Sequence, residues 1–241
     1  MRFDPEERMP SAASKQETLL PELLHALSQP LTALRCSLEL TLHQPRDSEE
    51  YRRRLRESLG LAEEVTTLAS GIRELLEAEK PARGVKEVDF TKLVRMIFRD
   101  FLPVGDDRGI GLNLISAAGL IVIGGEYEMS KAVFHLLDFV LGTASRGDDV
   151  NVQLSGGETG IDLVLEMIRG SDRSGLEQPH TRAAAKSYVA FLIARRIFEV
   201  AGGVVQVKRE PNHTLIQVTL QAVVHKSEHI ATQTHGACKS A

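Results

Sequence analysis

The sequence has 241 residues, 42% of them hydrophobic and 26% charged, and a formal net charge of −4 at pH 7. The acidic balance argues against nucleic acid as a partner, because proteins that bind it usually carry a basic surface. Two cysteines are too few for a disulfide framework or a cysteine-rich zinc site, and they favour a cytoplasmic location. The N-terminus is acidic and no apolar run approaches the roughly 18 residues that cross a bilayer, so we expect neither a secretory signal nor a membrane partner.

The N-terminal part of the chain is predicted to begin with a flexible arm and a long helix. Residues 1–15 are polar and contain two prolines. From Gln16 to His43 leucines recur every three or four residues, which is typical of an apolar stripe along a helix in a bundle or coiled coil. The stripe consists of Leu20, Leu24, Leu27, Leu31, Leu34, Leu38 and Leu42.

A second helix is predicted from an N-cap at Asp47 or Ser48 to about Lys80. Its apolar residues are expected on one face, and they are Leu55, Leu59, Ala62, Val65, Leu68, Ile72 and Leu76. Two helices joined by a short turn form a helical hairpin. Because a lone hairpin would leave both stripes in water, we expect residues 16–80 to form a homodimeric four-helix bundle.

The pattern changes after a linker at 81–84 and predicts an α+β fold for 85–222, with helices on one face of a sheet. Asp89 is expected near the start of the first helix, and Gly202 is expected to end the last one. Residues 223–241 are polar and are predicted to be a flexible tail. The predicted elements are a helix from about Thr91 to Phe101, strands at 110–116 and 119–125, a helix at 128–145, strands at 149–156 and 160–169, a helix at 186–203, and a hairpin at 203–222 that turns at Pro211 and Asn212.

One polar strip on the first helix contains a candidate nucleophile. His25, Ser28, Gln29, Thr32 and Cys36 recur at helical spacing beside the leucine stripe. The strip therefore faces solvent or a partner. An exposed imidazole is partly neutral near pH 7, so a ring nitrogen can attack phosphorus. The alternative is that His25 is an ordinary surface histidine.

The order of these elements resembles the cytoplasmic core of bacterial sensor histidine kinases over roughly residues 16–222. That core is a dimerisation and histidine phosphotransfer hairpin followed by an α/β sandwich of the Bergerat ATP-binding type. The stretch "HALSQPLTAL" is similar to the family's phospho-accepting box. By this resemblance His25 carries the phosphoryl group and Pro30 shapes the helix below it. Gln29 occupies the position of a polar residue that orients the water which dephosphorylates a receiver aspartate.

The resemblance extends to the ATP-binding segments, but their functional residues differ. "GGEYEMSKAVFHLLDFVLGTAS" is similar to the family's N-box region, and "ARRIFEVAGGVVQV" is similar to the last helix and the strand after it. Phe139 stands where an asparagine contributes to magnesium coordination, and a phenyl ring has no oxygen for this metal. His135 or Asp138 are the possible substitutes. Ala26 replaces the acidic residue that acts as a base toward the histidine.

The two glycine boxes of the family are also altered. An ungapped placement puts Arg169 where the adenine-reading aspartate belongs, whereas a three-residue shift would use Asp172 and Gly175. Tyr188 and Ala190 replace two glycines that let backbone amides approach the phosphates. Together these changes favour a sandwich that no longer binds ATP.

The sequence therefore predicts a histidine phosphotransferase of a bacterial two-component phosphorelay, with His25 and Gln29 as catalytic residues and with no bound cofactor or metal. Its expected partners are response-regulator receiver domains and a second copy of the chain. The alternatives are a divergent but active sensor histidine kinase and a non-catalytic pseudokinase adaptor. The basic run "YRRRLRES" at 51–58 is interpreted as a solvated helix face or as a docking site for an acidic partner.

Overall fold

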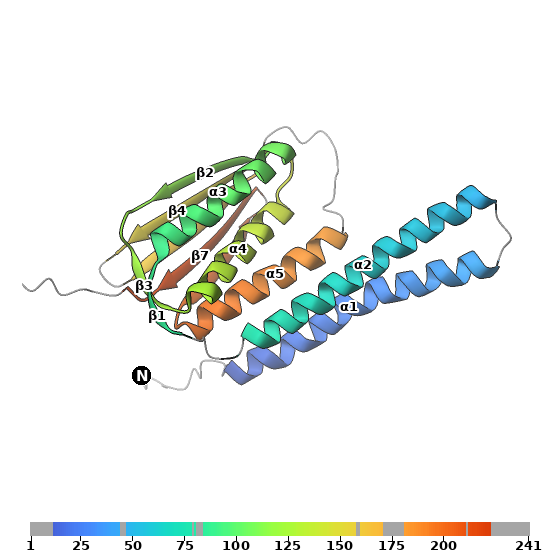
Figure 1. Cartoon of the computed structure of the whole chain (residues 1–241), viewed down its shortest axis with the longest axis horizontal. Coiled ribbons are helices and arrows are strands. Elements are labelled where there is room, and N and C mark those ends of the chain that lie inside the picture. Colours follow the sequence, from blue (N-terminus) through green and yellow to red (C-terminus); the bar gives the residue numbers. More distant parts are fainter. Residues whose placement is uncertain are drawn as a thin grey trace, which may run out of the picture.

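Two long antiparallel helices, α1 (Ala12–His43) and α2 (Ser48–Ala78), form a hairpin that extends beside and beyond the rest of the molecule (Figure 1). The computed structural model describes residues 12–43, 47–78, 80, 84–157, 160–170, 181–210 and 212–222. Residues 1–11 of the predicted arm and the predicted tail at 223–241 lie outside these ranges. No described helix combines the length and apolar composition that crossing a bilayer requires.

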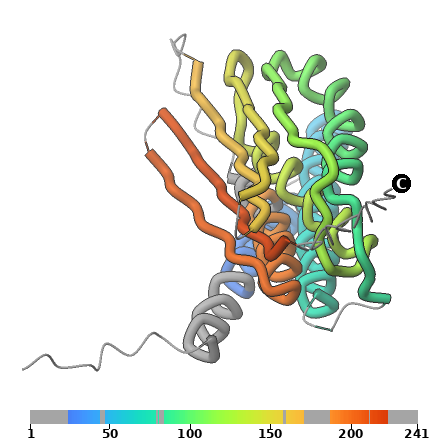
Figure 2. The backbone as a smooth tube through the Cα atoms, turned by 90° about the vertical axis from the view of Figure 1, so that its left-hand side faces the viewer, coloured from blue at the N-terminus to red at the C-terminus, as the bar shows by residue number. Residues whose placement is uncertain are grey.

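The remainder of the chain forms a sandwich of helices and strands. Its elements are β1 (Lys86–Asp89), α3 (Phe90–Arg108), β2 (Gly111–Ser116), β3 (Ile121–Gly124), α4 (Glu126–Thr143), β4 (Asp149–Gly156), β5 (Ile161–Ile168), α5 (Thr181–Val200), β6 (Val204–Glu210) and β7 (His213–Leu220). The five-stranded sheet has the order β2-β4-β5-β7-β6, in which β2 and β4 are parallel and the other neighbours antiparallel. Helices α3, α4 and α5 lie together against one face of this sheet (Figures 1 and 2). The α+β prediction is therefore confirmed.

The core of the sandwich follows from alternating burial along its strands. In β4 and β5, buried and more exposed residues alternate, as expected when one face of a sheet is covered. Val152 is opposite Leu165 across the two strands, and both side chains are buried. Phe90 of α3 and Phe198 of α5 are fully buried and help to close the helical side of this core.

Local sequence signals set several helix ends. The Asp47 carboxylate accepts a hydrogen bond of 2.7 Å from the Glu50 amide, and Asp89 accepts one of 2.9 Å from the Lys92 amide. Gly202 adopts φ of 80°, the left-handed conformation that ends α5. These three predictions are confirmed. Helix α3, however, continues past Phe101. Pro103 cannot donate to the carbonyl of Arg99, but both residues are exposed, so solvent can reach this part of the helix.

The predicted single apolar face of α2 is wrong, because α2 contacts both α1 and α5. Leu61, Leu68 and Leu75 are buried, and Leu68 and Leu75 belong to the same core cluster as the sandwich. Leu55, Leu59 and Leu76 instead are between 56% and 60% exposed. On α1, the exposed part of the predicted stripe is formed by Leu24, Leu31, Leu38 and Leu42.

Candidate functional site

His25 is exposed on α1 and has a defined neighbour. The Gln29 Nε2 atom lies 3.2 Å from the His25 Nε2 atom, one helical turn away. In this arrangement the amide N–H donates to the imidazole, which leaves the imidazole proton on Nδ1 and the lone pair on Nε2. Ser28, Thr32 and Cys36 are also exposed, so the polar strip predicted from the sequence is present. The two predicted catalytic side chains, His25 and Gln29, are therefore in contact.

The backbone around His25 accommodates a proline without interruption. Pro30 is buried inside α1, which is continuous from Ala12 to His43. Its lack of an N–H leaves the helix without one regular hydrogen bond. Nearby hydroxyls bond to the backbone, from Ser28 Oγ to the Leu24 carbonyl at 2.7 Å and from Thr32 Oγ1 to the Ser28 carbonyl at 2.8 Å. Such side-chain bonds are typical of locally adjusted helix geometry.

The segment that resembles the N-box has an apolar residue at the predicted magnesium position. Phe139 is 3% exposed, and its ring centroid lies 5.1 Å from that of Phe191 on α5. The guanidinium of Arg209 lies 6.0 Å from the centre of the Phe139 ring. Phe139 thus fills the space between α4 and α5 and offers no oxygen ligand. No three His, Cys, Asp or Glu side chains within the described ranges come together as a possible metal site.

The segment that resembles the second glycine box is part of helix α5 and packs against the core. Ala190 is buried on α5, and Tyr188 is half-buried against the core. A Cβ atom on Gly142 would lie 2.2 Å from the Ser187 Oγ atom, which shows that helices α4 and α5 approach each other closely here. Tyr188 and Ala190 thus carry side chains at the positions where glycines would let phosphates approach the backbone. The described residues at the nucleotide positions therefore do not fit a magnesium nucleotide.

The first glycine box is only partly described. Arg169 follows β5, and its amide donates a hydrogen bond of 3.0 Å to the Asn212 carbonyl. Asp172 and Gly175, which the shifted placement would use, lie outside the described residues.

An ion-pair cluster that the sequence did not reveal joins α2 to α4. The Glu74 Oε2 atom lies 3.0 Å from His135 Nε2 and 3.4 Å from Lys131 Nζ. Burial lowers the pKa of His135, and the Glu74 carboxylate offsets only part of this effect. The imidazole is thus neutral near pH 7 and donates its Nε2 proton to Glu74. Glu74 and His135 are 61 residues apart, so no local pattern predicts their contact.

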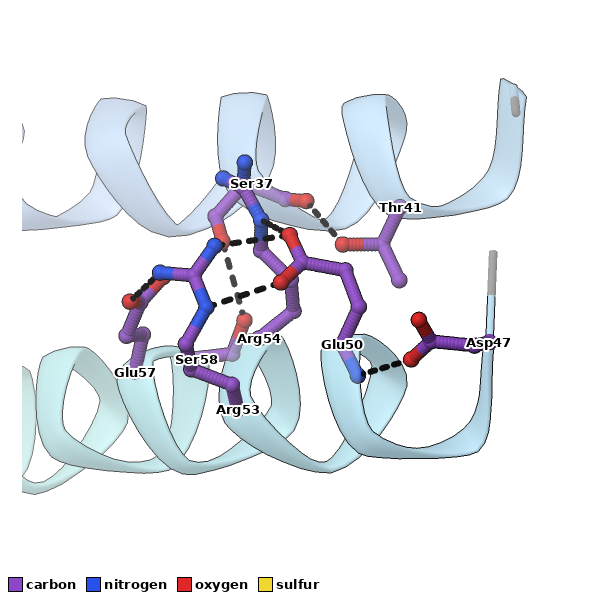
Figure 3. Close-up of polar contacts among 8 residues, drawn as sticks. All are labelled: Ser37, Thr41, Asp47, Glu50, Arg53, Arg54, Glu57 and Ser58. Atoms are coloured by element: carbon purple, nitrogen blue, oxygen red, sulfur yellow. Dashed lines mark hydrogen bonds and ion pairs between the residues drawn. The ribbon is translucent and has the colours of Figure 1, made fainter. Parts of the chain in front are cut away.

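Two of the four arginines in the basic run at 51–58 pair with neighbouring carboxylates on α2 (Figure 3). Arg53 donates to both Glu50 and Glu57, and Arg54 donates to Glu50. The hydrogen bonds from Arg53 and then Arg54 lower the pKa of Glu50 to about 2. These exposed pairs lie within a single helix and favour the interpretation as a solvated face.

A helical hairpin followed by this mixed sandwich is the fold of the cytoplasmic core of sensor histidine kinases, including its ATPase-type domain. Histidine kinase AdeS of Acinetobacter baumannii aligns with a TM-score of 0.58 at 15% identity, over 82% of this chain and 97% of that one. Histidine kinase ThkA, solved in complex with the response regulator protein TrrA, aligns with a TM-score of 0.64 at 13% identity, over 88% of this chain and 63% of that one.

Full-length ShkA, solved in complex with AMPPNP, aligns with a TM-score of 0.52 at 11% identity, over 84% of this chain and 46% of that one. No family model and no curated protein matches the sequence. At these identities the similarity establishes the fold alone. The chemistry of this chain must therefore be argued from its own residues.

Proposed function

We propose that this chain is a histidine phosphotransferase of a two-component phosphorelay, exchanging phosphoryl groups between His25 and receiver aspartates without ATP. The observation that supports this most directly is the exposed His25 on a hairpin of the histidine kinase fold, with the Gln29 amide 3.2 Å from its Nε2 atom. ThkA, which shares this fold, was solved with a response regulator, and this supports receiver domains as partners.

The proposed reaction needs only the imidazole from this chain. Once the Gln29 amide releases its hydrogen bond, the Nε2 lone pair of His25 attacks the phosphorus of a receiver aspartyl phosphate. An N–P bond forms as the P–O bond to the aspartate breaks, and the electron pair of that bond remains on the aspartate carboxylate. The Nδ1 proton is then released to solvent. The acyl phosphate supplies the driving force, so no nucleotide takes part, and reversal of the same steps phosphorylates a second receiver.

The experiment that tests this function uses receiver domains labelled on their aspartate. Incubation with the protein should produce acid-labile phosphohistidine on the wild-type chain and none on a His25→Gln variant. A His43→Gln variant is the matched control, because His43 is an exposed histidine on the same helix. A protein that remains unlabelled with every receiver would contradict the proposal and favour a pseudokinase adaptor. Equal labelling of the His25→Gln variant would also contradict it, because another residue would then accept the phosphoryl group.

We expect no binding of Mg-ATP at physiological concentrations. The physical reason is the combined placement of Phe139, Tyr188 and Ala190 at positions where magnesium ligands or phosphate-facing glycines would be needed. Isothermal titration of Mg-ATP into a preparation that accepts phosphoryl groups at His25 should give no heat attributable to a nucleotide site. A dissociation constant in the micromolar range would instead favour the divergent but active kinase.

Gln29 is expected to promote hydrolysis of the receiver aspartyl phosphate and to have little effect on phosphoryl transfer to His25. Its amide can both donate and accept, so it can orient a water at a receiver aspartyl phosphate. A Gln29→Ala variant should slow the release of free phosphate. Transfer to His25 should stay within a few-fold of wild type, because an exposed hydrogen bond contributes only about 1 kcal/mol. A time course on a labelled receiver separates phosphoprotein from free phosphate.

The same time course needs two further variants. Gln206→Ala removes an exposed glutamine from β6 and should change neither rate. His25→Ala should abolish transfer and spare some hydrolysis. Unchanged phosphate release in Gln29→Ala would remove this residue from the mechanism.

A further inference from the structure

Helix α2 lies directly against the part of α5 that resembles the second glycine box. A Cβ atom on Gly71 would lie only 2.5 Å from Val189 Cγ1, so the absent side chain lets the two helix backbones approach closely. Leu68, one turn earlier on α2, is 2% exposed and belongs to the sandwich core. The hairpin therefore contributes to the hydrophobic core of the sandwich, not only to its surface.

The same helix contacts the segment that resembles the N-box. Glu74 of α2 binds both His135 and Lys131 of α4 through its Oε2 atom. His135 is one of the two possible substitutes for the N-box asparagine, and its side chain is 15% exposed. A single helix thus contacts two of the three segments in which the nucleotide residues are altered, the N-box and the second glycine box.

Little space remains beneath α2 at this contact. A cavity of about 300 Å³ persists, lined by Thr66, Ser70 and Gly71 on α2, by His135 and Asp138 on α4, and by Ala190 on α5, among others. This volume is at the lower limit of pockets that hold small ligands. The protein's own helix occupies the remainder of the face.

The contact lies at the level of His25. The hydroxyls of Ser37 and Ser58 lie 3.2 Å apart and mark residues opposite each other in the hairpin. Ten residues back along α1 and ten forward along α2, the same antiparallel pairing brings Leu27 level with Leu68. Leu27 is partly buried against the same core cluster. Through Leu27, two residues from the histidine, the helix that carries His25 therefore contacts the core cluster to which Leu68 of α2 belongs.

We propose that the altered nucleotide face serves as a permanent seat for α2, defined here by Leu68, Gly71, Glu74, His135 and Val189. The sandwich is a fixed brace that holds the His25 helix in place, and the seat stays closed while phosphoryl groups are exchanged. That the seat stays closed during phosphoryl exchange rests on the proposed phosphotransfer function. The closed seat of the resting protein can be tested without it.

Thiol labelling tests the closed seat in the full-length protein. Position 189 is 4% exposed beneath α2, whereas the native Cys36 is exposed on α1. A Val189→Cys variant that also carries Cys36→Ser and Cys238→Ser is compared with a Cys238→Ser variant that retains Cys36. Maleimide should modify position 189 at least about 100-fold more slowly than Cys36. Rates within about tenfold of each other would overturn the proposal.

A cross-link tests whether the seat remains closed during transfer. The Cβ atom built on Gly71 lies 3.6 Å from Val189 Cβ, within the usual range of about 3.5 to 4.5 Å for a disulfide. A Gly71→Cys/Val189→Cys variant, without the native cysteines, should form this bond under mild oxidation. The oxidised protein should accept phosphoryl groups at His25 within about twofold of the reduced rate.

Two results would overturn the proposal, and one separates it from the proposed function. Failure of the disulfide to form, or loss of transfer on oxidation with recovery on reduction, would mean that the seat opens. If neither the oxidised nor the reduced protein accepts label while position 189 is protected, the phosphotransfer function fails and the brace stands.

Two glycines of α2 provide a test of packing. Gly71→Ala should lower the thermal midpoint because the methyl group meets Val189, whereas Gly60→Ala should raise or maintain it, since nothing lies within 4 Å of a Cβ atom there. Equal shifts in the two variants would contradict a close contact at Gly71.

Discussion

A Leu68→Glu variant is expected to lose a large share of the protein's free energy of unfolding at 25 °C. Leu68 is 2% exposed between α2 and the sandwich, so the change removes a buried side chain and places a carboxylate where no partner is provided. The combined cost should exceed about 4 kcal/mol, a large share of the stability of a typical domain. Urea unfolding followed by circular dichroism measures the loss.

Leu76→Glu is the control for this change, because Leu76 lies on the same helix and is 60% exposed. Its free energy of unfolding should remain within about 0.5 kcal/mol of wild type. Equal stability of the Leu68→Glu and Leu76→Glu variants would contradict the packing of α2 against α5.

A Leu31→Glu/Leu38→Glu variant is expected to be monomeric while retaining its helices. We propose that the native chain is a homodimer, because these leucines are 44% and 40% exposed on a face that the described chain does not cover. Two copies would bury them in a four-helix bundle, where each carboxylate would lack a partner. The dimer dissociation constant should rise about a thousand-fold or more, since losses at central interface positions reach several kcal/mol.

Light scattering at micromolar concentration reports this change, and circular dichroism verifies the helical content. The control is Ile115→Glu, which places the same charge at a residue that is 71% exposed. Ile115 belongs to β2, a strand that lies away from the hairpin (Figure 1). A native protein that is monomeric at this concentration would disprove the homodimer and indicate that another protein covers the leucines.

The fold could largely be predicted because its signals are local. Leucine spacing defined the hairpin, and alternation defined β4 and β5. Strand β1 was missed because it has only four residues, three of them charged, and its one buried residue, Val88, pairs with Val122 far along the chain. The extension of α3 through Pro103 was missed because the sequence does not indicate that this proline faces solvent.

The candidate site also has one contact that the sequence predicts and others that it does not. His25 and Gln29 are four residues apart on one helix, so their contact follows from helical periodicity. The packing of Leu68 and Leu75 of α2 in the sandwich core and the contacts of Glu74 with α4 could not be predicted from the sequence. Periodicity shows that a helix has an apolar face, but not which of several neighbours that face meets.

The part of the hairpin that extends beyond the sandwich also determines how much space a partner has. From His25 to the end of α1 at His43 the chain rises through 18 residues, or about 27 Å at 1.5 Å each. This length approaches the diameter of a small domain, about 30 Å. His25 lies at the boundary between the braced part and the projecting part. A globular protein can therefore contact the projecting hairpin on the surface that a second copy leaves open and reach the imidazole of His25 without displacing the sandwich.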